Sequence, residues 1–204
     1  MRRWVLAAAA VGASAGVLHA ALPTDPDVSG RTSLTGEFLV AAPQLREPHF
    51  AQTVILMVQH NRGGAFGIVV NRPLDNRPLA SIIEAYGADA GNISGSVKVF
   101  WGGPVTPDLS FVIHGSDYRV TDTVDIDGHV ALSAGPDVLR DIGLNKGPGK
   151  SLIAYGYAGW AAAQLEGEIA RGDWYSVPED PALVFDEDRS KVWTAAIARH
   201  NADH

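Results

Sequence analysis

At 204 residues, the chain is long enough for one domain that buries roughly two-thirds of its unfolded surface, so it needs no disulfide or metal for stability. It contains no cysteine, which excludes a disulfide framework, a thiolate nucleophile and a cysteine-based zinc site. The formal net charge of −7 opposes contact with phosphate backbones, so direct nucleic-acid binding is not expected.

Residues 1–22 have the pattern of a secretory signal or a membrane anchor. Arg2 and Arg3 give a basic start, and residues 4–22 are apolar, rich in small residues and free of charge. Cleavage after Ala15 or Ala20 fits this pattern, retention as an anchor is one alternative, and a start of translation further downstream is another. We therefore expect an exported protein, periplasmic or membrane-anchored, if this segment is real, with membrane contact only through it. Without the segment, a cytoplasmic protein is expected.

Residues 23–33 read as a linker because they are rich in Asp, Pro, Ser and Thr, and residues 34–204 form the expected domain. Within this domain, short β-branched or aromatic runs predict strands at 37–42, 53–59, 65–70, 97–101, 110–114, 129–132 and 151–157. Helical patterns occupy 79–86, 136–142, 159–171 and 190–200, with Pro136 in an early helical position and Ser190 as an N-cap. Strands outnumber helices without strict alternation, so the fold class is α+β, a single domain with a mixed, largely antiparallel sheet.

The expected junction of strand 151–157 with helix 159–171 is the first candidate ligand site. Its residues are Gly156, Tyr157, Gly159 and Trp160. The glycines leave room for an anion at the free N–H groups of the helix, or they simply permit a tight turn. Along the expected helix, one stripe carries Trp160, Gln164 and Glu168, beside a core stripe of Ala161, Leu165 and Ile169.

A predicted hairpin supplies the second candidate. The outgoing strand ends at His60 and Asn61, residues 62–64 make the turn, and the return strand ends at Asn71 and Arg72 before a proline. Arg72 suits a bidentate contact to a carboxylate or phosphate, and a surface ion pair is the alternative. The third candidate is a turn at Gly102, Gly103 and Pro104, where backbone N–H groups either line a pocket or only close a bend.

The sequence motifs include no complete set of catalytic residues, and we expect neither a metal nor a cofactor. Residues 144–151 lack the first glycine of a phosphate-binding P-loop, and residues 123–134 lack the first and last ligands of a calcium loop. His60 or His114 remains available as a general base.

Several motifs in order resemble the YqgE/AlgH family over about 34–200. They are Leu34-Thr35-Gly36-Glu37-Phe38, the run 39–43, the strand 50–58, His60-Asn61, Gly67 with Asn71-Arg72-Pro73, Gly102-Gly103-Pro104-Val105, Phe111-Val112-Ile113-His114, the run 156–160, the run 164–169 and Trp174. The resemblance implies an α+β fold with a bifurcated, partly barrel-like sheet, a cytoplasmic location, and a role in transcriptional regulation without a DNA-binding motif. It brings no agreed catalytic residues. The chain departs from the family pattern at Asp108-Leu109-Ser110, where the family commonly has Asp-Arg-Gly, and in its signal-like start.

Two function classes follow. The first is a non-enzymatic binding or regulatory protein that recognises a small anion or a protein partner near Asn71, Arg72 and the glycine turns. The second is an exported hydrolase or transferase that uses His60 or His114 as its base. Direct DNA regulation is a third, weaker hypothesis, because the chain is acidic and carries no basic recognition helix.

Overall fold

The computed structural model describes residues 33–186 and 188–202, so the expected leader and almost all of the expected linker lie outside the described residues. The strands are β1 (Glu37–Ala41), β2 (Val54–Asn61), β3 (Gly64–Val69), β4 (Pro73–Pro78), β5 (Ser96–Trp101), β6 (Val105–Gly115), β7 (Val124–Asp125), β8 (Val130–Ala134), β9 (Ser151–Ala161) and β10 (Trp174–Pro178). The helices are α2 (Leu79–Ala85), α3 (Pro136–Gly143), α4 (Gln164–Ala170), α5 (Pro181–Val184) and α6 (Arg189–Ala202). None of the helices in this part of the chain is both long and apolar enough to span a membrane.

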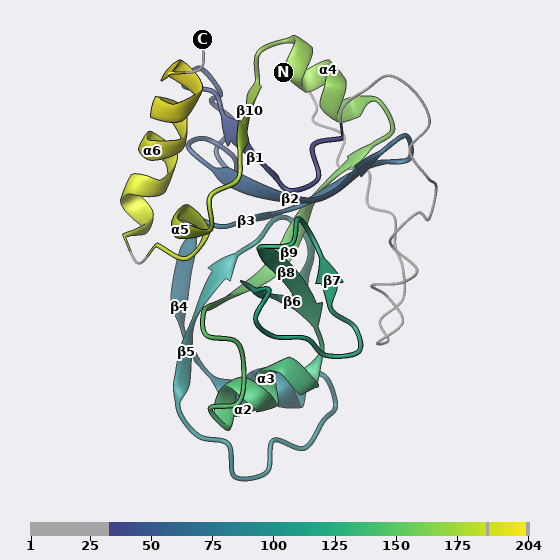
Figure 1. Ribbon diagram of the computed structural model, residues 1–204, viewed down its shortest axis with the longest axis vertical. Coiled ribbons are helices and arrows are strands. Elements are labelled where there is room, and N and C mark those ends of the chain that lie inside the picture. The colour runs from purple at the N-terminus through teal and green to yellow at the C-terminus, as the bar shows by residue number, and fades with distance from the viewer. Residues whose placement is uncertain (1–32, 187, 203–204) are drawn as a thin grey trace.

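One curled sheet organises the domain. Its strand order is β10-β1-β2-β3-β9-β6-β8-β7, and the β4–β5 pair branches from it where β5 runs parallel to β9. The remaining strand pairs are antiparallel, which gives the half-barrel seen in Figure 1, with α4 and α6 at one end and α2 and α3 at the other. The α+β, single-domain fold with a mixed, largely antiparallel sheet is thus confirmed.

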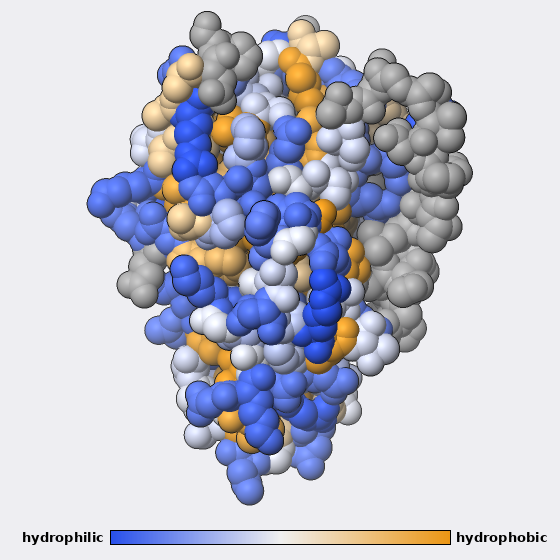
Figure 2. Space-filling model, in the orientation of Figure 1, coloured by the Kyte–Doolittle hydropathy of each residue, from blue (hydrophilic) through white to orange (hydrophobic). Residues whose placement is uncertain are grey.

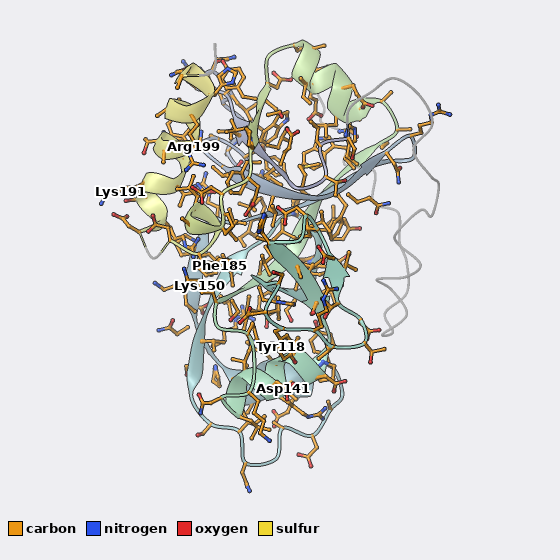
Figure 3. The ribbon with its side chains drawn as sticks, in the orientation of Figure 1. Tyr118, Asp141, Lys150, Phe185, Lys191 and Arg199 are labelled. Atoms are coloured by element: carbon orange, nitrogen blue, oxygen red, sulfur yellow. The ribbon has the colours of Figure 1, made fainter. Side chains whose placement is uncertain are left out.

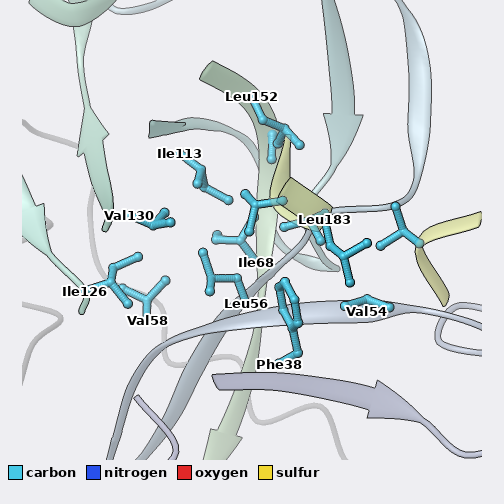
Figure 4. Packing of buried hydrophobic residues seen from close by; sticks show 14 of the residues in the cluster. Phe38, Val54, Leu56, Val58, Ile68, Ile113, Ile126, Val130, Leu152 and Leu183 are labelled. Atoms are coloured by element: carbon cyan, nitrogen blue, oxygen red, sulfur yellow. The ribbon is translucent and has the colours of Figure 1, made fainter. Parts of the chain in front are cut away.

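Strand β2 is buried on both of its faces, which explains its apolar run without alternation. Leu56 and Val58 belong to the main core inside the curled sheet, whereas Ile55 and Met57 belong to a second cluster on the opposite face. Figure 4 shows the main core, where Phe38 of β1 packs near residues of β2, β3, β6 and β8. A third cluster lies under α2 and α3. The face seen in Figure 2 is largely hydrophilic, with apolar residues in separate groups.

The expected helix 159–171 is wrong in its first five residues. Strand β9 continues to Ala161 because Trp160 and Ala161 pair with Ala65 and Gly64 of β3, and helix α4 begins only at Gln164. Ala161 is therefore exposed and is not part of a core stripe.

The expected N-cap at Ser190 is also wrong. Ser190 lies inside α6, which begins at Arg189, and its hydroxyl donates to Oδ1 of Asp188 at 2.5 Å. The sequence patterns did not reveal β4, β7, β10 or α5.

Candidate functional site

Glu168 is the centre of a buried polar cluster. Its Oε2 accepts hydrogen bonds from Nε1 of Trp160 at 2.8 Å and from Nε1 of Trp174 at 2.9 Å, and its Oε1 accepts from Nε2 of Gln164 at 3.0 Å. The carboxylate side chain is only 3% exposed. The structure therefore brings together three of the expected site residues, but their polar groups face one another instead of solvent. We interpret this cluster as a structural hydrogen-bond network that connects β9, α4 and β10.

The expected anion site directly after Gly159 does not form. Gly156, Tyr157 and Gly159 lie inside β9, several residues before α4, so no free helical N–H groups follow them. Tyr157 instead packs its ring on Phe66, with ring centroids 4.6 Å apart. The prediction failed because the strand extends further than the glycines indicated.

The glycine turns serve a close crossing of two backbone segments. Gly156 has φ +71°, and a Cβ atom there would lie 2.2 Å from the carbonyl oxygen of Gly103. A Cβ on Gly103 would lie 2.0 Å from the carbonyl carbon of Tyr157. Only glycine permits this close approach, so Gly103 and Gly156 are required where β5, β6 and β9 meet. Pro104 follows this crossing and leads into β6.

His60 lies at the far end of the β2–β3 hairpin, together with Asn61. Its Nδ1 accepts the N–H of Leu34 at 3.2 Å, and its Nε2 lies 3.7 Å from Oε1 of Glu166. The side chain is 7% exposed, and Oδ1 of Asn61 accepts the N–H of Gly63 in the turn. This histidine therefore fastens the start of the described chain to β2.

His114 is fully buried, with 0% exposure. Its Nδ1 donates to the carbonyl oxygen of Gly115 at 2.8 Å, which leaves Nε2 to accept from Oγ of Ser133 at 2.9 Å. Burial lowers the pKa of His114 below its ordinary value of 6.5, because the charged ring would lose its hydration. A base in this position has no access to a substrate.

Asn71 and Arg72 hold the loop that precedes β2. Oδ1 of Asn71 accepts the N–H of Val54 at 2.9 Å, and its Nδ2 donates to the carbonyl oxygen of Gln52 at 2.9 Å. Nη2 of Arg72 donates to the carbonyl oxygen of Ala51. No carboxylate among the described residues forms an ion pair with Arg72, so the expected surface ion pair is absent from this part of the chain.

Arg72 borders a half-buried aromatic surface that the sequence did not reveal. The backbone N–H of Trp101 donates to the carbonyl oxygen of Arg72 at 2.8 Å. The centroid of the Trp101 ring lies 5.7 Å from that of Phe50 and 6.4 Å from that of His49. We call His49, Phe50, Arg72 and Trp101 the Trp101 patch. The available sequence signal was the position of Trp101 directly before Gly102 and Gly103.

The predicted residues therefore separate into distinct places. Arg72, Gly102, Gly103 and Gly156 lie around the end of β5, His60 and Asn61 lie at the β2–β3 turn, and the Glu168 cluster is internal. Within the described residues, no group of three or more histidine, aspartate or glutamate side chains is placed to hold a metal ion. Beside the glycine crossing, the half-buried Arg72 and Trp101 supply N–H donors next to aromatic rings. The Glu47 carboxylate is bonded to His49 and to the N–H of Phe50 in the same loop.

Comparison with known proteins places this fold and these motifs in one family. The model of the AlgH-like family matches residues 38–204, and the chain belongs to that family. It is 42% identical to the UPF0301 protein AlgH of Pseudomonas aeruginosa over 173 residues, which are 84% of this chain and 90% of AlgH. It is also 42% identical to a UPF0301 protein of Methylococcus capsulatus over 168 residues, which are 82% of this chain and 92% of that protein.

Solved structures agree with this assignment. The solution structure of Pseudomonas aeruginosa AlgH superimposes with a TM-score of 0.71 at 40% identity, covering 85% of this chain and 92% of AlgH. A crystal structure of a Corynebacterium diphtheriae protein shares the fold, with a TM-score of 0.64 at 22% identity, covering 85% of this chain and 90% of that one.

Proposed function

We propose that this AlgH-like chain is a non-enzymatic binding or regulatory protein whose recognition surface is the Trp101 patch. The ligand is an anionic acceptor group, a carboxylate or phosphate, carried by a small molecule or by a protein partner with an adjacent apolar group. This proposal keeps Arg72 and the Gly102 turn from the sequence hypothesis and adds Trp101 as their neighbour.

One observation carries the proposal. Of the tryptophans in the described residues, Trp160 and Trp174 donate their indole N–H to Glu168, and Trp193 donates to the carbonyl oxygen of Ala41 at 2.8 Å. The indole N–H of Trp101 has no hydrogen-bond partner within this part of the chain, and its ring is half-buried. A tryptophan with an apolar body against the protein and a free donor at the surface is typical of an interface residue.

The other members of the patch complement this donor. Arg72 is fixed by Ala51 through one nitrogen, which leaves further guanidinium N–H groups that can bind an anion in a defined geometry. His49 is exposed, with its side chain 70% accessible, and can contact the same ligand. Phe50 connects Trp101 to the core, because its ring centroid also lies 5.7 Å from that of Trp174, which belongs to a buried core cluster.

The histidine-based enzyme receives less support from the geometry. His114 is enclosed, and the Nδ1 atom of His60 is occupied by the N–H of Leu34. The net charge of −7 remains unfavourable for direct DNA binding, so a regulatory role would act through a partner other than nucleic acid.

Titration calorimetry tests the proposal with three probes: acetate, inorganic phosphate and the peptide acetyl-Glu-Asp-Phe. We expect at least one probe to bind, and Arg72→Ala to weaken that binding about tenfold or more, because a charge-assisted contact is lost. Trp101→Phe keeps an aromatic ring but removes the indole N–H, so it should weaken binding less than Arg72→Ala does. Arg140→Ala, on α3 away from the patch, is the matched control. Equal affinities in all four proteins, or no binding by any probe, would contradict the proposal.

A further inference from the structure

The two outer strands of the curled sheet meet at a pair of carboxyl groups. Strands β10 and β7 stand at opposite ends of the strand order, and neither pairs with the other. Glu179 directly follows Pro178, which pairs with Glu37 of β1, so Glu179 lies across from the start of β1. Asp127 lies in the turn after β7, and its charge acts on the Glu179 carboxyl group. The same turn touches the start of β1, since a Cβ on Gly36 would lie 2.9 Å from the Cβ of Asp127.

Asp127 is held in place as an acceptor. Its Oδ1 accepts the backbone N–H groups of His129 and Val130, each at 2.9 Å. The Oε1 atom of Glu179 is buried and has no hydrogen-bond partner in the described structure. Two ionised carboxylates this close repel each other, which favours the state in which Glu179 keeps its proton. Burial of Glu179 and the neighbouring Asp127 carboxylate raise the pKa of Glu179 from 4.5 to about 8.

Other charged groups surround this pair. Asp180 adds to the negative field at Glu179, whereas Arg199 opposes it and also forms an ion pair with Asp180. Figure 3 labels Arg199 on α6. Three further titratable groups lie on the elements packed here: His129, Glu37 and His200. Glu37 of β1 accepts a hydrogen bond from the hydroxyl of Ser176. The His200 ring of α6 stacks on Tyr175, with ring centroids 4.0 Å apart.

Apolar core lies directly behind the pair. Ile126 and Val130 flank Asp127 in the sequence, and Val177 and Leu183 flank Glu179; all four belong to the main core cluster. Figure 4 shows Ile126 and Val130 beside Val58 of β2. Separation of the two strand ends would therefore expose core side chains to solvent.

We propose that Glu179 and Asp127 form a proton-operated latch that closes the half-barrel between its two outer strands. The latch is closed when Glu179 carries the proton and donates to Asp127. Loss of the proton turns the contact into a repulsion, and the β7–β8 turn moves away from the end of β10. This inference does not depend on the Trp101 patch.

The direction of the pH effect follows from linkage. The folded pKa of Glu179 lies above its unfolded value, so the folded state binds more protons between pH 4.5 and about 8. The stabilising contribution is complete below 4.5 and is lost as the pH rises through about 8. A single proton changes the unfolding constant by at most about tenfold per pH unit. Because Asp127 is exposed on its outer side, a smaller slope is expected.

Urea denaturation from pH 6.5 to 9 tests the stability effect. We expect the unfolding constant of the wild-type protein to rise several-fold with pH up to about 8, and that of Glu179→Gln, whose amide still donates to Asp127, to stay nearly flat. Glu84→Gln, at an exposed position on α2, is the control and should follow the wild type. The same slope in Glu179→Gln and the wild type would overturn the proposal.

A distance measurement tests the opening itself. The chain has no cysteine, so His129→Cys and Pro178→Cys allow spin labels on the two sides of the latch. We expect one narrow distance distribution at pH 6.5 and a longer, broader one at pH 9.5, with no such change when Glu179→Gln is added. Identical distributions at both pH values would overturn the opening, whatever the stability data show.

Discussion

The indole nitrogen of Trp174 donates to Oε2 of Glu168 at 2.9 Å and thereby ties strand β10 to helix α4. The same oxygen accepts from Trp160 of β9, so one buried carboxylate joins three elements that follow one another along the chain. A buried carboxylate is costly unless donors surround it, and here three N–H groups do so. The cluster therefore specifies how α4 packs, although its residue types first indicate a binding site.

Loss of this carboxylate should destabilise the fold. Glu168→Ala leaves two indole N–H groups and the amide of Gln164 without acceptors, and we expect the free energy of unfolding to fall by about 3 kcal/mol. Glu168→Gln keeps an acceptor oxygen but turns one N–H donor toward another, and about 1 to 2 kcal/mol is expected. Urea denaturation followed by circular dichroism measures both. Stability within error of the wild type in Glu168→Ala would contradict the structural role.

The glycine crossing predicts a strong position effect for alanine. Gly156→Ala places a Cβ against the backbone of Gly103 and keeps a positive φ, so we expect a loss of more than about 3 kcal/mol or failure to fold. Gly91→Ala is the matched control, because Gly91 also has a positive φ but faces open space. Only about 1 kcal/mol is expected there. Thermal unfolding of the two variants distinguishes steric exclusion from backbone strain, and equal losses would contradict the crossing.

His114 predicts a loss of stability in acid. Its folded pKa lies below the unfolded value of 6.5, so the unfolded state binds more protons as the pH falls below 6.5. Protonation of Nε2 also reverses its bond with Ser133, whose hydroxyl must turn from donor to acceptor. Denaturation from pH 7 to 5 measures this effect in the Glu179→Gln background, which removes the opposing dependence of Glu179. In that background, His114→Gln should reduce the loss of stability between pH 7 and 5. An unchanged pH profile would contradict the role of His114 in acid denaturation.

Local patterns predicted much of this fold because each predicted strand carries apolar residues between clear turn residues. β4 escaped notice because all six of its residues are exposed and it begins and ends with proline. The boundary at Trp160 was missed for a different reason: its strand conformation depends on pairing with Ala65, a contact that spacing in the sequence does not reveal.

The candidate site shows the same division. The N–H of Trp101, which precedes Gly102, donates to the carbonyl oxygen of Arg72. The half-buried position of Trp101 depends on its contact with Phe50 in the loop at 43–53, which lies far away in the sequence. Asp127 and Glu179 are about as far apart in the sequence, and their proximity requires the curvature of the whole sheet. Such relationships depend on tertiary structure and leave no local pattern.

The free donor of Trp101 is the central claim, and the ¹⁵N–¹H resonance of its indole reports on it directly. Acetate, inorganic phosphate and acetyl-Glu-Asp-Phe are each added to ¹⁵N-labelled protein, and any probe that binds should shift the Trp101 indole signal along a saturating curve, because its N–H gains an acceptor. The Trp193 signal, which is bonded internally, should remain in place. The shift should be strongly reduced in Arg72→Ala. A Trp101 signal that moves with none of the three probes, or that moves equally in Arg72→Ala, would contradict the account.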